Sequence, residues 1–79
     1  MPKVVVRMTK EEIANLTKYL RGKFGNPAFE VRARPNKNDS AEVYLGEEFI
    51  GVMYLDEDEG ERSFNFQMAI LDIDLEDYS

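Results

Sequence analysis

Apolar residues between positions 10 and 24 recur at the three- and four-residue spacing of a single helix face. This stripe comprises Ile13, Leu16, Leu20 and Phe24, flanked by Tyr19. The preceding Thr9-Lys10-Glu11-Glu12 is a capping-box signature, in which Thr9 caps the first turn and Glu12 reaches back. Gly22 and Gly25 are possible stop signals, and Pro27 cannot continue the helix. The pattern therefore predicts a helix over residues 10–23.

Beyond residue 28 the period changes to two, which is typical of strands with one buried face. Alternation predicts strands over residues 29–34, 41–45, 48–55 and 62–70. Residues 35–40 and the acidic run 56–61 are rich in turn formers and are expected to be loops. Leu55 is expected opposite Arg62, and Gly51 is expected to make room for an aromatic ring. Apolar parity changes after Ile70, which indicates a bulge or a strand end.

These elements predict an α+β fold, with one N-terminal helix packed on a three- to four-stranded antiparallel meander in the order α-β-β-β-β. We expect an extended N-terminal arm over residues 1–8, a single domain over 9–75 and a frayed tail over 76–79. The helix covers one face of the sheet. That inner face is expected to collect Phe29, Val31, Val43, Leu45, Phe49, Met53, Leu55, Phe64, Phe66 and Met68.

The opposite face of the sheet has no second helix to cover it. Its apolar part is the set Tyr44, Ile50, Val52 and Tyr54. Exposed apolar patches of this kind mark interfaces, so these four residues are the predicted partner-binding site. The N-terminal arm or the C-terminal tail covering the face is the alternative, and the sequence does not decide between them.

The chain has 79 residues and no Cys or His, so disulfides and the usual metal anchors are absent. A domain this small has a narrow stability margin, which favours a partner subunit as the stabilising element. Without Cys, and without an apolar run of membrane-spanning length, the chain is expected to be cytoplasmic and to make no membrane contact. The simplest partner is a second copy, since two-fold homodimers are the commonest assembly.

Charge is divided unevenly along the chain. Residues 1–37 carry nine Lys/Arg and three Asp/Glu, a net of +6, whereas residues 38–79 carry one Lys/Arg and thirteen Asp/Glu, a net of −12. Internal matching of the two halves is the expected use of this asymmetry. The overall charge of −6 opposes nucleic-acid binding, which depends on neutralising phosphates.

An RNA or single-strand site remains an alternative on the open sheet face. Arginine and aromatic side chains on a sheet stack bases in RNA-binding modules, and here the candidates are Arg32, Arg34, Tyr44 and Tyr54. Glu30 and Glu42 on the same face oppose this role. Ion pairing of Arg32 or Arg34 with Glu42 across the strands is the preferred interpretation.

No motif indicates catalysis, a metal or a cofactor. Asp56, Asp58 and Gly60 lack the remaining ligands of a calcium loop. Asp72 and Asp74 alternate with apolar residues and are expected on the solvated side of a strand or turn. Neither Ser40 nor Ser63 has a histidine to activate it. The chain is therefore expected not to be an enzyme.

Several segments resemble a family of short uncharacterised alphaproteobacterial proteins, catalogued as a domain of unknown function. The segments are LRGKFGNP (20–27), VRARP (31–35), DSAEVY (39–44), EFIGV (48–52) and FNFQMAILDIDL (64–75). The resemblance covers roughly residues 12–76 and implies a compact bacterial cytosolic protein. It supplies no site, substrate or cofactor. Sequence alone thus indicates a non-enzymatic interaction module that binds itself or another protein.

Overall fold

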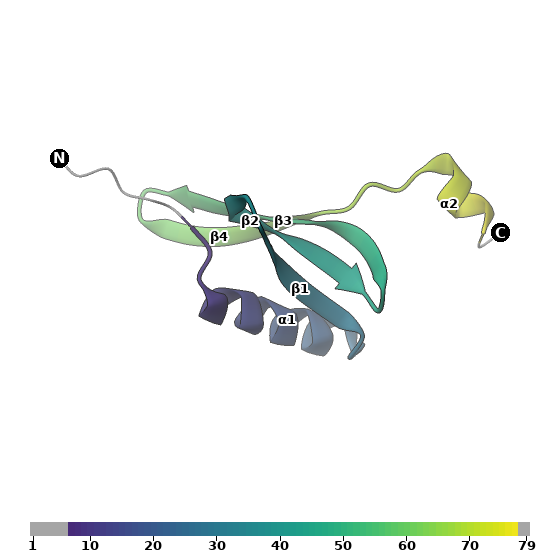
Figure 1. The fold of residues 1–79 in the computed structure, drawn as a ribbon, viewed down its shortest axis with the longest axis horizontal. Helices are drawn as coiled ribbons and strands as arrows, with labels where there is room; N and C mark the ends of the chain where they lie inside the picture. Colours follow the sequence, from purple (N-terminus) through teal and green to yellow (C-terminus); the bar gives the residue numbers. More distant parts are fainter. Residues whose placement is uncertain (1–6, 78–79) are drawn as a thin grey trace.

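A computed structural model describes residues 7–77 as a helix, a four-stranded antiparallel sheet and a short second helix (Figure 1). The elements are α1 (Lys10–Phe24), β1 (Phe29–Arg34), β2 (Lys37–Leu45), β3 (Glu48–Asp58), β4 (Glu61–Gln67) and α2 (Asp72–Glu76). The strands follow one another in the order β1-β2-β3-β4, which confirms the predicted helix-plus-meander fold. Most of the predicted N-terminal arm, residues 1–6, lies outside the described residues.

The predicted capping box begins α1. Thr9 Oγ1 accepts a hydrogen bond from the Glu12 amide at 3.0 Å, and Glu12 Oε1 accepts one from the Thr9 amide at 2.9 Å. Gly25 ends the helix in the left-handed conformation, with φ of 60°, and its N–H donates to the Arg21 carbonyl. Glycine adopts this conformation without a Cβ penalty, so the chain passes Gly22 and stops at Gly25.

Both outer hairpins are tighter than the sequence predicted. Lys37 already pairs with Arg34, so β2 starts four residues earlier than expected. The acidic run is mostly strand, because a two-residue turn at Glu59 and Gly60, with φ of 49° and 83°, closes the β3–β4 hairpin. Positive φ at both turn positions matches the right-handed twist of the flanking strands.

The tight β3–β4 turn corrects the predicted register. Leu55 pairs with Phe64, and Arg62 pairs with Glu57 instead of Leu55. The predicted register differs from the observed one by two residues. Because side chains alternate between the faces with a period of two, this difference leaves each side chain on its predicted face. Phe64 and Phe66 therefore still lie on the helix side of the sheet, where they pack against the core.

A bulge in β3 changes the predicted faces. Val43 pairs with Gly51 and Tyr44 pairs with Phe49, so Ile50 is an extra residue without a partner on β2. Phe49 consequently turns to the side of Tyr44 and is 51% exposed, so its predicted place on the inner face is wrong.

The structure confirms that Gly51, next to the bulge, makes room for an aromatic ring. A Cβ placed on Gly51 would lie 2.6 Å from the Phe66 ring and would also meet the Gln67 carbonyl oxygen. Real Cβ atoms do not approach a neighbour this closely, so Gly51 is the residue that lets β4 lie against β3 at this point.

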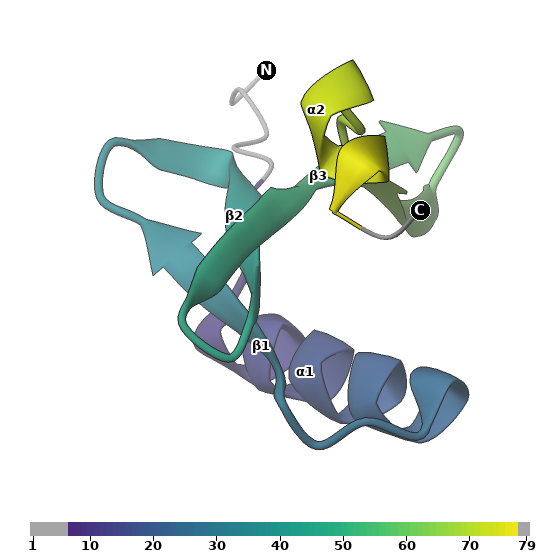
Figure 2. The same ribbon diagram turned by 90° about the vertical axis from the view of Figure 1, so that its right-hand side faces the viewer.

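The core lies between α1 and the half of the sheet nearest β1. Its buried apolar members are Met8, Leu20, Phe29, Val31, Ala41, Val43 and Met53. Met8 enters this core because its amide donates to the Asn38 carbonyl at 2.7 Å, which fixes the chain beside β2. Leu55, Phe64 and Phe66 are only partly buried, since α1 packs chiefly along β1 (Figure 2).

β4 ends at Gln67, which is three residues earlier than predicted, and the chain then leaves the sheet (Figure 1). Residues 68–77, named here the C-terminal arm, are exposed throughout. The predicted inner-face position of Met68 is therefore wrong, because Met68 lies beyond the last strand and is half-exposed. Residues 72–76 form α2, where Asp74 Oδ2 accepts a hydrogen bond from the Leu71 amide at 2.9 Å. Among residues 7–77, no helix combines the length and apolar character needed to cross a bilayer.

Candidate interaction surfaces

The face of the sheet away from α1 carries three of the four predicted partner-binding residues. Tyr44 and Val52 are half-buried and Tyr54 is 43% exposed. Ile50 differs, because the β3 bulge lets it pack partly against the core. Phe49 joins this face and meets Tyr44 edge to face, with ring centroids 5.7 Å apart. The hydrophobic alternation in the sequence did not reveal the bulge that moves Phe49 and Ile50.

An open groove of about 710 Å³, named here the β3 groove, lies between this face and the C-terminal arm. Ile50, Val52 and Tyr54 line its sheet side, together with Phe49. Ile70, Leu71 and Leu75 line its arm side. The structure thus brings three of the predicted residues together with an apolar segment that the sequence had placed at the end of the last strand, inside the predicted domain 9–75.

The C-terminal arm carries a concentrated set of exposed apolar side chains. These are Met68, Ile70, Leu71, Ile73 and Leu75, between 49% and 64% exposed. Single exposed apolar residues are ordinary on protein surfaces. Here four of the five, all but Ile73, line the same groove, which is typical of an interaction site. The arm runs beyond the end of the sheet (Figures 1 and 2). Its residues form one side of the open β3 groove.

The candidate nucleic-acid residues are engaged in contacts of their own. Arg32 pairs with Glu30 at 2.8 Å and lies 3.9 Å from the centre of the Tyr44 ring, so its guanidinium covers one face of that ring. The hydrogen bond that Arg32 donates to Glu30 raises the pKa of Arg32 above its usual value. The expected pairing of Arg32 or Arg34 with Glu42 is wrong, because Arg34 donates to the Ser40 hydroxyl at 2.9 Å.

Glu42 is held by Tyr44 on its own strand and not by an arginine. The Tyr44 hydroxyl donates to Glu42 Oε1 at 3.1 Å. Glu42 also lies directly opposite Val52 on β3. Its carboxylate therefore stays beside the apolar patch, where it disfavours phosphate binding.

The two edge strands of the sheet, β1 and β4, differ in whether other parts of the chain bond their outer backbone groups. On β1, the Val31 amide donates to Thr17 Oγ1 at 3.0 Å and the Phe29 carbonyl accepts from Arg21 Nε at 2.7 Å. Side chains of α1 thereby occupy backbone groups that a further strand would need. β4 is the other edge, and within residues 7–77 it pairs with β3 alone. The sheet is therefore open along β4.

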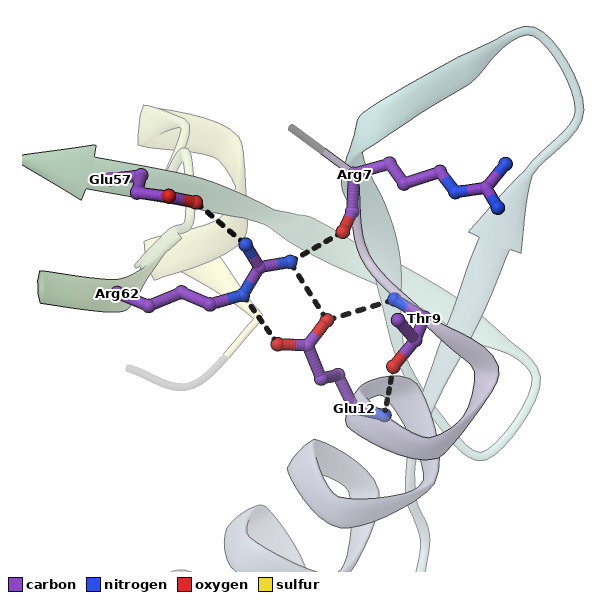
Figure 3. Close-up of polar contacts among 5 residues, drawn as sticks. All are labelled: Arg7, Thr9, Glu12, Glu57 and Arg62. Carbon is purple, nitrogen blue, oxygen red and sulfur yellow. Dashed lines mark hydrogen bonds and ion pairs between the residues drawn. The ribbon is translucent and has the colours of Figure 1, made fainter. Parts of the chain in front are cut away.

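Arg62, which sequence analysis did not single out, joins β4 to the start of α1 (Figure 3). Its Nε and Nη2 donate to Glu12 at 2.6 and 3.0 Å, and its Nη1 donates to Glu57 at 2.7 Å. Nη2 also donates to the Arg7 carbonyl. The hydrogen bond from Arg62 is the main reason that the pKa of Glu12 falls from 4.5 to about 2, and the Thr9 amide adds to it.

The charge asymmetry is not neutralised within the described residues. Their three ion pairs are Arg32–Glu30, Arg62–Glu12 and Arg62–Glu57. Of these three ion pairs, only Arg62–Glu12 joins residues 1–37 to residues 38–79. Its arginine comes from the acidic half of the chain. Lys18 and Lys23 on α1 make no ion pair within residues 7–77, and Arg21 donates to the Phe29 carbonyl on β1.

The acidic residues do not form a metal centre in the described structure. No group of three or more His, Cys, Asp or Glu within residues 7–77 is arranged to hold an ion. Asp56 and Asp58 lie on β3 beside the tight turn, and Asp72 and Asp74 lie on α2. The two pairs are thus on separate elements.

Comparison with known proteins gives one match. The model of the family DUF3126, described as proteins of unknown function, matches residues 12–74. The match includes the whole sheet and most of the C-terminal arm, through the first half of α2. No curated protein and no solved structure matches the chain.

Proposed function

The chain belongs to the DUF3126 family, whose description assigns no activity, and we propose that it is a non-enzymatic protein-interaction module that associates with a second copy of itself. The observation that carries this proposal is the exposed C-terminal arm beside the open β3 groove. Most of the arm falls inside the matched family region, so it belongs to the domain and is not an appendage to it.

The energetics favour a partner that covers the arm. Fully burying a large aliphatic side chain stabilises a structure by about 1.5–3 kcal/mol. The five apolar side chains of the arm are each roughly half-exposed, so covering one arm yields on the order of 5 kcal/mol. A two-fold pair covers two arms, which brings the gain into the range of the association cost of about 4–15 kcal/mol.

A second copy is the simplest partner for a chain with these features. The domain is small and has no Cys, so it lacks the disulfides that many small domains use. Two-fold symmetry requires only that one surface be complementary to itself or to a second surface of the same chain. The β3 groove and the arm provide an apolar concavity and an apolar projection on the same molecule.

Sedimentation of the full chain tests the proposal. At about 100 μM, where complexes of micromolar dissociation constant are assembled, the chain is expected to sediment at twice its 9.2 kDa mass. Val52→Lys and Ile70→Asp are expected to shift it to monomer. Lysine is chosen at Val52 because Glu42 lies directly opposite, so the new charge is compensated within the sheet.

Ala14→Lys is the matched control. Ala14 is exposed on α1 and lines neither the β3 groove nor the arm. This variant should associate like the unmodified chain, and circular dichroism should show that all three variants are folded. If the unmodified chain remains a 9.2 kDa monomer at about 100 μM, the proposal is overturned.

A further inference from the structure

The strand pattern of β4 continues beyond the point where β3 stops pairing with it. Its alternating apolar positions are Phe64, Phe66, Met68 and Ile70. The last pair between the two strands is Val52 with Gln67, because the bulge at Ile50 follows on β3. Residues 68–70 run on in the direction of β4 (Figure 1), and no strand within the described residues pairs with them. They form an apolar, strand-like segment that lacks a strand partner there.

Alternate backbone groups of β4 point away from β3. The β3–β4 hairpin closes on Asp58 and Glu61 across a two-residue turn, and such a closing pair exchanges both of its backbone hydrogen bonds. The bonds to β3 therefore belong to the odd-numbered residues of β4. The N–H and C=O groups of Arg62, Phe64 and Phe66 face outward, and within residues 7–77 no further strand pairs with them.

The outward groups of β4 and residues 68–70 can complete each other in two copies. When one strand pairs antiparallel with its own copy, a two-fold axis perpendicular to the sheet relates the two, and one residue lies opposite itself. With Phe66 at that position, Met68 lies opposite the partner's Phe64. Ile70 lies opposite the partner's Arg62. Each copy then supplies the strand that residues 68–70 of the other copy lack.

We propose that two copies of the chain pair antiparallel through residues 62–70, with Phe66 on the two-fold axis, so that their sheets join into one continuous sheet. The apolar side chains of the paired strands lie on the helix side, where Phe64 and Phe66 are only partly buried in one copy. On the other face Asn65 lies opposite the partner's Gln67, and two amides can both donate and accept. This inference rests on the self-association proposed above and identifies the edge through which it occurs.

The position of the axis follows from the length of the strand-like segment. Only an axis at Phe66 pairs the whole of residues 62–70 with itself. An axis at residue 65 sets Ile70 opposite Gly60 in the turn. An axis at residue 67 draws Asp72, the first residue of α2, into the strand. With Phe66 on the axis, no charged residue within 61–71 lies opposite a like charge.

The remaining edge of the sheet limits the assembly to two copies. Thr17 and Arg21 of α1 bond the backbone of Val31 and Phe29 on β1, so that edge is occupied. Each copy therefore offers one edge, and a two-fold pair uses both edges. An unrelated strand could bond the same edge, but only a second copy brings a segment 68–70 that needs a partner in the same register.

Disulfide trapping tests the axis, because the native chain has no cysteine to interfere. Asn65 and Gln67 are exposed and bond inward to β3, so across the axis they form a non-hydrogen-bonded pair with Cα atoms about 4.5 Å apart. This separation permits a disulfide. Mixing Asn65→Cys with Gln67→Cys at about 100 μM under mild oxidation is expected to give a cross-linked dimer on a non-reducing gel.

The controls fix the register. Ser63→Cys mixed with Gln67→Cys is the matched control, because Ser63 is exposed on the same face of β4 but lies two residues out of register with the partner's Gln67. This mixture and each single variant alone should cross-link more slowly. Fast cross-linking of Asn65→Cys alone or of Gln67→Cys alone places the axis at that residue and overturns the proposed register.

Charge substitution at the same pair provides an independent measurement. Asn65→Lys with Gln67→Glu on one chain sets opposite charges across the axis and should lower the dissociation constant of the dimer roughly fivefold. The reversed pair, Asn65→Glu with Gln67→Lys, should act in the same direction. Asn65→Lys with Gln67→Lys should raise the dissociation constant, although it reduces the net negative charge of the chain. Equal dissociation constants for all three would contradict the contact.

The outcomes separate this inference from the proposal on which it rests. If the native chain dimerises but the mixture of Asn65→Cys with Gln67→Cys cross-links no faster than the control mixture, the copies meet elsewhere and only the inference is wrong. A monomeric native chain overturns both.

Discussion

Arg62 on β4 holds both carboxylate oxygens of Glu12 in the first turn of α1, at 2.6 and 3.0 Å, across fifty positions of sequence. Glu12 also closes the capping box with Thr9. One side chain therefore both begins the helix and fixes its start to the far strand of the sheet (Figure 3). This contact also positions one wall of a small groove between α1 and β4, which is lined by Glu12, Asn15, Leu16, Tyr19 and Phe64.

This pair predicts a specific loss of stability in acid. The Glu12 carboxyl has a pKa of about 2 in the folded chain against 4.5 as its ordinary value, so the unfolded chain binds more protons between these values. The stabilisation is fully present above pH 4.5 and is lost as pH falls toward 2. After allowance for partial solvent exposure of the pair, its size is ~1–2 kcal/mol.

Urea unfolding at a series of pH values measures this effect. Glu12→Gln keeps an oxygen for the Thr9 amide, so the capping box survives while the charge is removed. The unfolding free energy of the native chain should exceed that of the variant at pH 6, and the two should converge near pH 2. Profiles that stay parallel over this range would contradict the assignment.

Gly51 is predicted to tolerate no side chain. Gly51→Ala places a Cβ against the Gln67 carbonyl oxygen and 2.6 Å from the Phe66 ring. The ring can shift but the backbone of β4 must also move, which should cost about 1–3 kcal/mol. Thermal unfolding measures the loss. Gly22→Ala is the control, because a Cβ at Gly22 meets nothing within 4 Å and alanine favours the helix, so this variant should be more stable than the native chain.

The β3–β4 turn is predicted to contain a residue that can be improved. Glu59 has φ of 49°, a left-handed conformation that non-glycine residues other than Asn and Asp rarely adopt. Glu59→Asn should raise the unfolding free energy by about 0.5–1 kcal/mol, because Asn-Gly is the preferred pair for this turn. Glu61→Asn removes the same charge outside the turn and serves as the control. Equal gains from both variants would show that lost repulsion, and not turn geometry, is responsible.

The surface charges predict weak or absent nucleic-acid binding. Arg32 is occupied by Glu30 and Tyr44, and Glu42 lies beside the same patch. Fluorescence anisotropy with a labelled single-stranded RNA should show no saturable binding, even at low salt where phosphate contacts are strongest. Salt-sensitive binding that Arg32→Ala and Tyr54→Ala both weaken would instead support the base-stacking alternative.

Local patterns in the sequence predicted the elements but not every boundary. The stripe of α1 and its capping box lie within one continuous segment, so spacing alone located that helix. The register of β3 with β4 depends on how few residues form the turn at Glu59 and Gly60, and composition does not reveal that number. The parity of the strands survived the error because a two-residue slip preserves the faces.

The candidate surfaces were predicted in part. The alternation that gave Tyr44, Val52 and Tyr54 is local, whereas the bulge that moves Phe49 and Ile50 arises from pairing with β2. The exposure of the C-terminal arm was not visible in the sequence, because alternating apolar residues after Phe66 are equally typical of a continuing strand.

By itself the sequence determined the helix, the number of strands, their order as a meander and the excess of acid in the second half of the chain. These depend on spacing, capping and charge, which are properties of neighbouring residues. The tertiary structure decided which charges remain unpaired, that α1 closes the β1 edge through Thr17 and Arg21, and that the β4 edge and the C-terminal arm stay open. Those features depend on where distant segments meet, which only packing in three dimensions determines.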